Sequence, residues 1–249
     1  MLKALDQLPS DLELWKTLVQ LCSPDEAKGL LYKATESIPD SSDLWLALAK
    51  LETYENARTV LNQAREQMPT DHTIWITAAK LEEAQGNLTS VEKIVSRAIK
   101  KLSSHGVKVR REDWLREAVV AEGAGSVVTA RAIIKETMMY GVDEGLQEGS
   151  TSDKDKVKIL KRVWNENAEA CITQGHIETA RAIYFNAVHL HPNKKSLWFN
   201  SIKLEEEHGS KQNLTDILNR AKNSTKHVFF YLKLAKHLWK TLHDAEGTR

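Results

Sequence analysis

Tryptophan and proline recur together along this chain at a fixed spacing. Four of its seven tryptophans have a proline six residues before them, and two successive intervals between these tryptophans are 30 residues long. The four pairs are Pro9 with Trp15, Pro39 with Trp45, Pro69 with Trp75 and Pro192 with Trp198. Because the chain has only five prolines, chance does not explain this spacing. Recurrence at such a period indicates an array of short structural repeats.

An alanine followed by a basic residue marks a second position in the repeat. The basic residue comes thirteen residues after the tryptophan in the first two repeats and seventeen residues after it in two later ones. These residues are Lys28, Arg58, Arg131 and Arg181. The difference of four residues is about one helical turn, so the first two hairpins are expected to be one turn shorter. Each repeat is predicted to hold a helix A with the tryptophan, a turn, and a helix B with the basic residue.

Local signals place the ends of these helices. Ser23, Pro24 and Glu26 are typical of a capping box that opens a helix, and the prolines between repeats end each helix B. Apolar residues recur every three or four positions, as in Leu44, Trp45, Leu48 and Leu51, which indicates amphipathic helices. The expected helices span 12–21, 24–37, 42–53, 54–67, 72–85, 88–103, 111–123, 127–140, 157–174, 176–190, 194–208, 211–223 and 227–241.

A single helix pair cannot bury its apolar stripe, so neighbouring pairs must stack. We therefore expect an all-α fold, a right-handed superhelix (solenoid) of antiparallel helix pairs that forms one domain over 1–249. It would hold about six pairs, a mobile loop over 141–155 and a partial unit at each end. Residues 2–8 resemble the end of a helix B and 244–246 the start of another, as in a fragment of a longer solenoid. The predicted repeat core consists of Trp15, Trp45, Trp75, Trp114, Trp164, Trp198, Pro39, Pro69, Pro192, Arg58, Arg131 and Arg181, and Tyr231 is expected in the tryptophan place of the last helix.

Composition and motifs argue against several classes of function. The net charge of +1 gives no long-range field for a polyanion, and no apolar run is long enough to cross a membrane. Cys22 and Cys171 have no metal-ligand spacing and are expected as reduced, buried thiols. Gly123–Ser126 is interpreted as a turn, since no strand precedes it. With no nucleotide or hydrolase motif, we expect no catalysis, no metal and no cofactor.

Two basic clusters and one charged pair are the candidate surface features. Glu52 and Arg58 are placed to pair across a hairpin turn, although other repeats do not keep both members, which argues against a general device. The clusters are interpreted either as solvated helix faces or as an auxiliary, salt-dependent contact to RNA phosphate or an acidic partner. No exposed aromatic ladder accompanies them, which disfavours base stacking. The candidate interaction residues are Lys100, Lys101, Arg110, Arg111, Lys158, Lys161 and Arg162.

The repeat resembles the HAT (half-a-TPR) repeat of RNA-processing proteins. Trp45, Glu52, Arg58 and Pro69 carry the whole pattern, and Ala180–Tyr184 matches its helix B signature. Two stretches, 44–66 and 69–87, resemble the pre-mRNA-processing factor 6 family in particular, and the resemblance weakens at 141–163 and 223–231.

This resemblance implies a non-catalytic scaffold in the nucleus. Its partners would be spliceosomal proteins of the U4/U6-U5 tri-snRNP, with a possible auxiliary RNA contact and no membrane. Two alternatives stay open. One is a HAT scaffold of another RNA-processing complex, in ribosomal RNA processing or messenger 3′-end cleavage, and the other is direct RNA binding through the basic clusters. A monomer or a weak dimer is expected.

Overall fold

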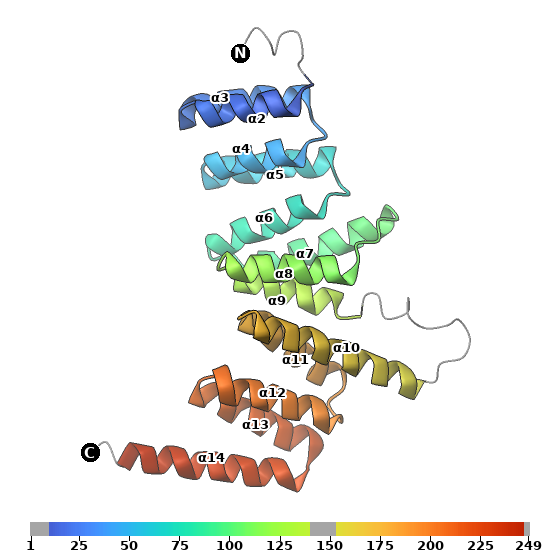
Figure 1. Ribbon diagram of the computed structural model, residues 1–249, viewed down its shortest axis with the longest axis vertical. Coiled ribbons are helices and arrows are strands. Elements are labelled where there is room, and N and C mark those ends of the chain that lie inside the picture. The colour runs from blue at the N-terminus through green and yellow to red at the C-terminus, as the bar shows by residue number, and fades with distance from the viewer. Residues whose placement is uncertain (1–9, 140–152, 247–249) are drawn as a thin grey trace. The chain divides into compact units, whose positions relative to one another are not determined.

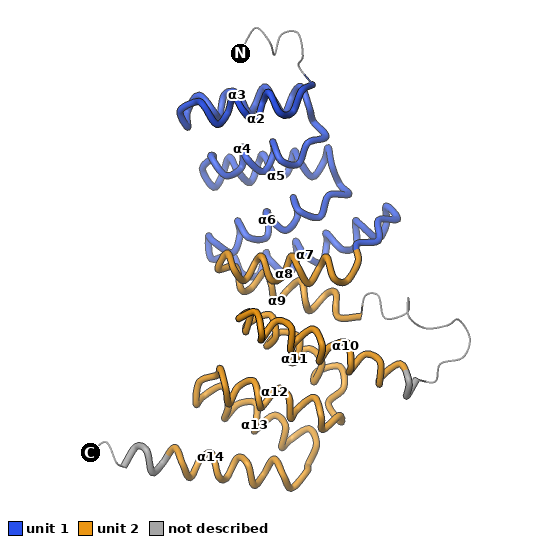
Figure 2. Tube along the Cα trace, viewed as in Figure 1, with its two compact units in different colours: residues 1–109 blue, residues 110–249 orange. Residues whose placement is uncertain are grey.

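The computed structural model describes residues 10–139 and 153–246, with side chains left undescribed at 153–155 and 242–246. This part of the chain holds thirteen α-helices, α2 to α14, and no strand, which confirms the all-α fold of stacked helix pairs (Figure 1). The chain divides into two compact units, Met1–Val109 and Arg110–Arg249 (Figure 2). The single domain over 1–249 and the right-handed superhelix stay predictions.

Unit 1 consists of three antiparallel helix pairs. Helix α2 packs on α3, α4 on α5 and α6 on α7, while α3 with α4 and α5 with α6 join successive pairs. Every helix starts at its expected position, because capping residues and the first apolar residues of each stripe determine where a helix begins. The helices are α2 (Leu12–Leu21), α3 (Pro24–Ser37), α4 (Ser42–Leu51), α5 (Tyr54–Gln67), α6 (His72–Ala84) and α7 (Leu88–Ser104).

Unit 2 repeats the same plan. Helices α8 with α9, α10 with α11 and α12 with α13 form hairpins, α11 packs on α8, α9 and α12, and α14 packs on α13. The helices are α8 (Arg111–Gly123), α9 (Val127–Thr137), α10 (Asp153–Thr173), α11 (Ile177–Leu190), α12 (Lys195–His208), α13 (Lys211–Thr225) and α14 (Val228–Glu246).

The hairpin turns explain the two repeat lengths. In the first two hairpins, two extended residues join the helices, and the backbone N–H of Ser23 donates to Glu26 Oε2 at 3.2 Å in the expected capping box. The later helices α6, α8 and α10 run longer, and two residues after each of them comes a glycine with positive φ, which is 80° at Gly86, 81° at Gly125 and 84° at Gly175. A residue in the left-handed conformation commonly follows a helix, because it lets the next backbone N–H groups bond the last carbonyl groups of that helix.

Three prolines, Pro39, Pro69 and Pro192, place a carbonyl group for the tryptophan six residues later. The indole N–H donates to the proline carbonyl in three repeats, at 3.0 Å for Trp45, 3.3 Å for Trp75 and 2.7 Å for Trp198. Trp164 follows no proline and donates to the carbonyl of Met138 at 3.1 Å instead. The buried ring therefore keeps a partner for its polar atom, as a buried indole requires.

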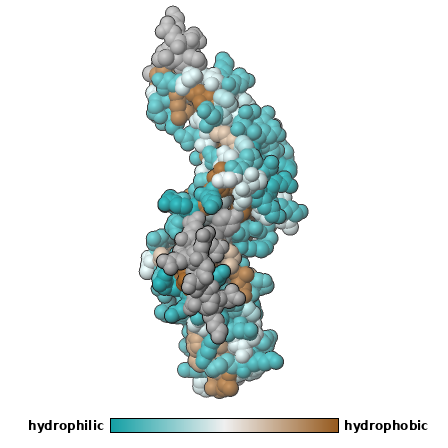
Figure 3. All heavy atoms as spheres, turned by 90° about the vertical axis from the view of Figure 1, so that its right-hand side faces the viewer, coloured by the Kyte–Doolittle hydropathy of each residue, from teal (hydrophilic) through white to brown (hydrophobic). Residues whose placement is uncertain are grey.

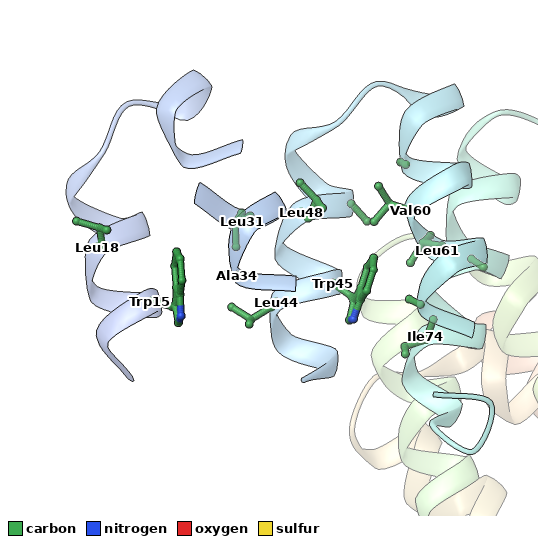
Figure 4. Close-up of a cluster of buried hydrophobic side chains, with 14 residues drawn as sticks. Trp15, Leu18, Leu31, Ala34, Leu44, Trp45, Leu48, Val60, Leu61 and Ile74 are labelled. Carbon is green, nitrogen blue, oxygen red and sulfur yellow. The ribbon is translucent and has the colours of Figure 1, made fainter. Parts of the chain in front are cut away.

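The core of unit 1 is built from these rings and small residues. Figure 4 shows Trp15 lying toward Leu31, Ala34 and Leu44, and Trp45 lying toward Leu61 and Ile74. Each ring thus fills the space between its own hairpin and the neighbouring helices. Removing one ring would leave a cavity shared by several helices.

The start of α10 and the end of α14 differ from their expected positions. Helix α10 begins at Asp153, four residues before its expected start, so the loop expected over 141–155 ends earlier; acidic residues suit a first helical turn. The rest of that loop and the segment 2–8 lie outside the described residues. The expectation that 244–246 start a new helix is wrong, because α14 continues to Glu246.

The expectation that Tyr231 occupies the tryptophan place is also wrong. Tyr231 is 47% exposed, whereas its neighbour Phe230 is 0% exposed. The Phe230 ring packs against Phe199, with ring centroids 5.5 Å apart, and against Phe229 at 5.4 Å. Without a proline to fix the register, the sequence does not choose among three adjacent aromatic residues, Phe229, Phe230 and Tyr231.

Candidate protein-interaction surface

The described residues contain no arrangement that suggests metal or thiol chemistry. No group of three or more His, Cys, Asp and Glu side chains in the described ranges could hold a metal ion. Burial raises the pKa of the Cys171 thiol to about 11, so this thiol stays protonated near neutral pH. Cys22 is half-buried and also free.

Within residues 10–139 and 153–246, no helix is both long and apolar enough to cross a bilayer.

The tryptophans predicted to form the repeat core lie in the interior of the two units. All six are buried, and Trp164 is fully so. The seventh, Trp239 on α14, is 64% exposed. The prediction of the other core members is wrong: Pro39, Pro192, Arg58 and Arg131 are exposed, and Pro69 and Arg181 are half-buried. Each of the three arginines contacts a carboxylate.

Basic residues of helix B pair with the next repeat. Arg58 Nε of α5 lies 3.3 Å from Glu82 Oε1 of α6, and Arg181 Nε of α11 lies 2.6 Å from Glu205 Oε1 of α12. Both pairs are separated by 24 residues in sequence, and both carboxylates come seven residues after a repeat tryptophan. These ion pairs therefore link one hairpin to the following one.

The expected pair between Glu52 and Arg58 is wrong. Glu52 accepts a hydrogen bond from Asn56 Nδ2 at 2.9 Å. This hydrogen bond and then the charge of Lys28, which lies 24 residues before Glu52, lower the pKa of the Glu52 carboxyl group. A pair within one hairpin is therefore not a general device, as expected, and Arg58 and Arg181 find their carboxylate partners in the next repeat instead.

Glu82 shows how fully such a carboxylate is satisfied. It is only 5% exposed and accepts from Tyr54 Oη at 3.1 Å and from Asn87 Nδ2 at 3.0 Å, besides its contact with Arg58. A buried charge without partners would destabilise the fold by several kcal/mol. The pairing thus fixes the register between α5 and α6.

Unit 2 extends this pairing into a network. Glu178 at the start of α11 lies 2.5 Å from Arg131 Nη2 of α9 and also contacts Arg181, which reaches Glu205. Burial raises the pKa of Glu178, but the hydrogen bond from Arg131 and the charges of both arginines outweigh it, so the pKa is lowered. The network therefore joins α9, α11 and α12 through side chains alone.

A second carboxylate ties α8 to α11. Glu122 accepts from the backbone N–H of Glu178 at 2.9 Å and of Thr179 at 2.8 Å, and from the Thr179 hydroxyl at 2.6 Å. A negative charge at a helix N-terminus binds its free N–H groups and is stabilised by the helix dipole. Sequence reasoning missed this cap, because its two ends are more than fifty residues apart.

The structure does not bring the predicted interaction cations into one site. Lys100 and Lys101 are on α7 in unit 1, and the other five are in unit 2. Two of those five are in ion pairs, Arg110 with Asp113 at 3.0 Å and Arg162 with Glu166 at 3.7 Å. Arg111 and Lys161 are half-buried, whereas Lys158 is exposed.

A different group of cations surrounds a hollow of about 300 Å³ in unit 1, which we call the basic groove. Helices α5 and α7 each pack on α6, and α6 supplies the floor between them. Sequence reasoning missed this group because its members come from two helices with a third between them. The basic groove is lined by Arg58, Leu61, Asn62, Arg65, Ala78, Leu81, Glu82, Ser90, Lys93, Ile94 and Arg97.

Helix α14 presents apolar side chains to the surface. Val228, Leu232 and Trp239 are each about two-thirds exposed and share one helical face. Figure 3 shows brown patches at the lower end of the picture, where α14 lies. An exposed apolar face of this kind is typical of a contact surface.

Together these features define a helical-repeat protein whose neighbouring hairpins are joined by buried rings and ion pairs. Comparison with known proteins then shows which helical-repeat proteins this chain is similar to. The chain is similar to Pre-mRNA-processing factor 6 of Homo sapiens, with 44% identity over 116 residues, which cover 47% of this chain and 11% of that protein. It is 39% identical over 142 residues to Pre-mRNA-splicing factor prp1 of Schizosaccharomyces pombe, covering 57% of this chain and 14% of that protein. These matches confirm the resemblance to the pre-mRNA-processing factor 6 family.

The matched region thus spans between a tenth and a seventh of these relatives' length. No protein-family model matches the chain. Among solved structures, the APC/C hetero-tetramer Cut9-Hcn1 gives a TM-score of 0.37 at 13% identity, covering 95% of this chain and 44% of that chain. The P58(IPK) TPR domain gives 0.30 at 16% identity, covering 95% and 66%. At these TM-scores the likeness carries no argument.

Proposed function

We propose that the chain is a non-catalytic scaffold segment that acts in pre-mRNA splicing in the nucleus. The observation that carries this proposal is its 44% identity to Pre-mRNA-processing factor 6, a relative whose name assigns it to pre-mRNA processing. The finer part of the proposal is that the helical-repeat surfaces bridge protein components of the U4/U6-U5 tri-snRNP. That part follows from the family resemblance of the repeat motifs.

The side-chain chemistry supports a structural role. The most buried carboxylates, Glu82 and Glu205, are held by arginines of the preceding repeat. Carboxylates held in this way fix the geometry between neighbouring hairpins. A stack held at each joint can present a defined surface to a large partner.

Direct RNA binding through the predicted basic clusters has weaker support. Arg110 and Arg162 are already paired with carboxylates, so they are less available to phosphate groups. We also propose that the chain is a monomer or a weak dimer in solution, and sedimentation equilibrium tests this.

Affinity capture from nuclear extract tests the proposed function. The tagged chain would be incubated with extract treated with ribonuclease, so that capture through RNA is removed. We expect tri-snRNP proteins among the captured proteins. Capture of ribosomal RNA-processing or 3′-end cleavage factors in their place would overturn the splicing assignment. Loss of all capture after ribonuclease treatment would favour direct RNA binding.

A further inference from the structure

The charges around the basic groove are unbalanced. Four cations line it, and Glu82 is the single carboxylate among its lining residues. Arg58 already pairs with Glu82. In contrast, Lys93 and Arg97 make no ion pair or side-chain hydrogen bond within the part of the chain that the structure describes. The groove therefore keeps two cations, Lys93 and Arg97, that pair with no carboxylate among the described residues of unit 1.

Arg65 shows that this positive charge is felt inside the groove. Its guanidinium group lies over the Trp75 ring, 4.8 Å from the centroid, and donates to Asn62. Burial, followed by the like charges of Arg97 and Arg58, lowers the pKa of Arg65. A carboxylate placed among these cations would relieve their repulsion and gain charge-assisted hydrogen bonds.

The floor of the groove adds an apolar component. Leu61 and Ala78 are buried there, and Leu81 and Ile94 are half-buried beside them. The hollow of about 300 Å³ lies at the lower end of the range of ligand pockets, roughly 300–1,000 Å³. It thus has room for a few side chains, one of them apolar, and not for a folded domain.

These properties fit a peptide better than RNA. No aromatic side chain is among the lining residues in the described part of unit 1, and Arg65 already covers the nearby Trp75 ring. Single-stranded RNA gains much of its affinity from stacking on exposed aromatic rings. An acidic peptide needs only cations for its carboxylates and an apolar floor for one anchor, and both are present.

We propose that the basic groove binds an acidic peptide segment of a partner protein. Its carboxylates contact Lys93 and Arg97 on α7, and an apolar side chain between them packs on Leu81 and Ile94. The inference rests on the proposed scaffold function, for which it names one contact. It gives carboxylate partners to Lys93 and Arg97, which form no ion pair within the described residues.

Peptide binding to the purified full chain tests this inference. A short labelled peptide that alternates Glu and Leu is titrated with the chain, and fluorescence anisotropy gives the Kd. The groove variant carries Lys93→Glu and Arg97→Glu, both at exposed positions. The matched control carries Lys33→Glu and Lys50→Glu, which reverse two exposed charges of unit 1 outside the groove. Circular dichroism checks that each variant is folded, and Arg97→Gln is the milder alternative if the groove variant is not.

We expect the groove variant to weaken peptide binding at least about tenfold, and the control to change it less than about twofold. Added salt should weaken binding to the wild type, because the contacts are exposed ion pairs. Absence of binding to the wild type, or equal losses in groove and control variants, would overturn the inference. So would an RNA of equal charge that binds more tightly and loses affinity in the groove variant. This assay contains no spliceosomal component, so its failure is separate from failure of the capture experiment.

Discussion

Arg181 joins two repeats, so its removal should cost much more than the loss of an ordinary surface cation. Its side chain contacts Glu178 at the start of α11 and Glu205 on α12, and it is only 20% exposed. Replacing it by methionine keeps much of the volume but leaves the buried Glu205 carboxylate without its arginine partner. Breaking a buried pair typically costs about 3–5 kcal/mol. Because Glu178 is partly exposed and keeps Arg131, we expect about 2–4 kcal/mol for Arg181→Met.

Urea unfolding followed by circular dichroism measures this loss. The matched control is Arg162→Met, because Arg162 is 71% exposed and pairs with Glu166 one turn away on α10. That change should cost less than about 0.5 kcal/mol. The double variant Arg181→Met with Glu205→Met should recover at least half of the loss, since two apolar side chains can replace a buried ion pair.

The comparison of these variants decides the role of the inter-repeat pair. A cost for Arg181→Met no larger than that for Arg162→Met would refute the reasoning. So would a double variant less stable than either single one, because the two side chains would then not act on each other.

Three further predictions concern the core, a turn and acid sensitivity. Trp164→Ala should lower the free energy of unfolding by about 3–5 kcal/mol, and a shift of the urea midpoint measures it; an unchanged midpoint would show that this ring is not core. Gly209→Ala should destabilise the chain, because the added methyl group would lie 2.6 Å from the Glu205 carbonyl oxygen. Gly29→Ala on α3 should instead stabilise the chain by about 0.5–1 kcal/mol, because nothing lies within 4 Å of the added methyl group. Equal thermal midpoints for these two variants would contradict this. The pKa of Glu178 is lower in the folded state than its ordinary 4.5, so its contribution to the free energy of unfolding is present above pH 4.5 and is lost as the pH falls through the folded pKa. Glu178→Gln should therefore flatten the loss of stability below about pH 4.5, as measured by urea unfolding at a series of pH values. An unchanged slope would contradict this.

Most of the fold could be predicted from the sequence because most repeats carry residues that mark where their helices begin and end. The tryptophan, the proline before it and the capping signals fix where helices begin and end. Where these residues are missing the prediction failed, as at Phe230 and Tyr231, because periodicity alone does not choose between adjacent aromatic residues.

The contacts between repeats could be predicted less well. The constant separation of 24 residues between Arg58 and Glu82, and between Arg181 and Glu205, was present in the sequence. The prediction paired Arg58 with Glu52 of the same hairpin, whereas a side chain on helix B can also reach the following helix A, as Arg58 reaches Glu82. The basic groove was missed for a related reason, since charge clusters along the sequence need not share a surface.

Binding of the purified chain to purified tri-snRNP particles tests the central claim most directly. Sedimentation through a glycerol gradient at physiological salt, after ribonuclease removes free RNA, separates particles from unbound chain. The scaffold account predicts that the chain moves with the particles and that the Arg162→Met control does so equally. A chain that stays at the top of the gradient with intact particles, while binding naked RNA in a parallel assay, would contradict it.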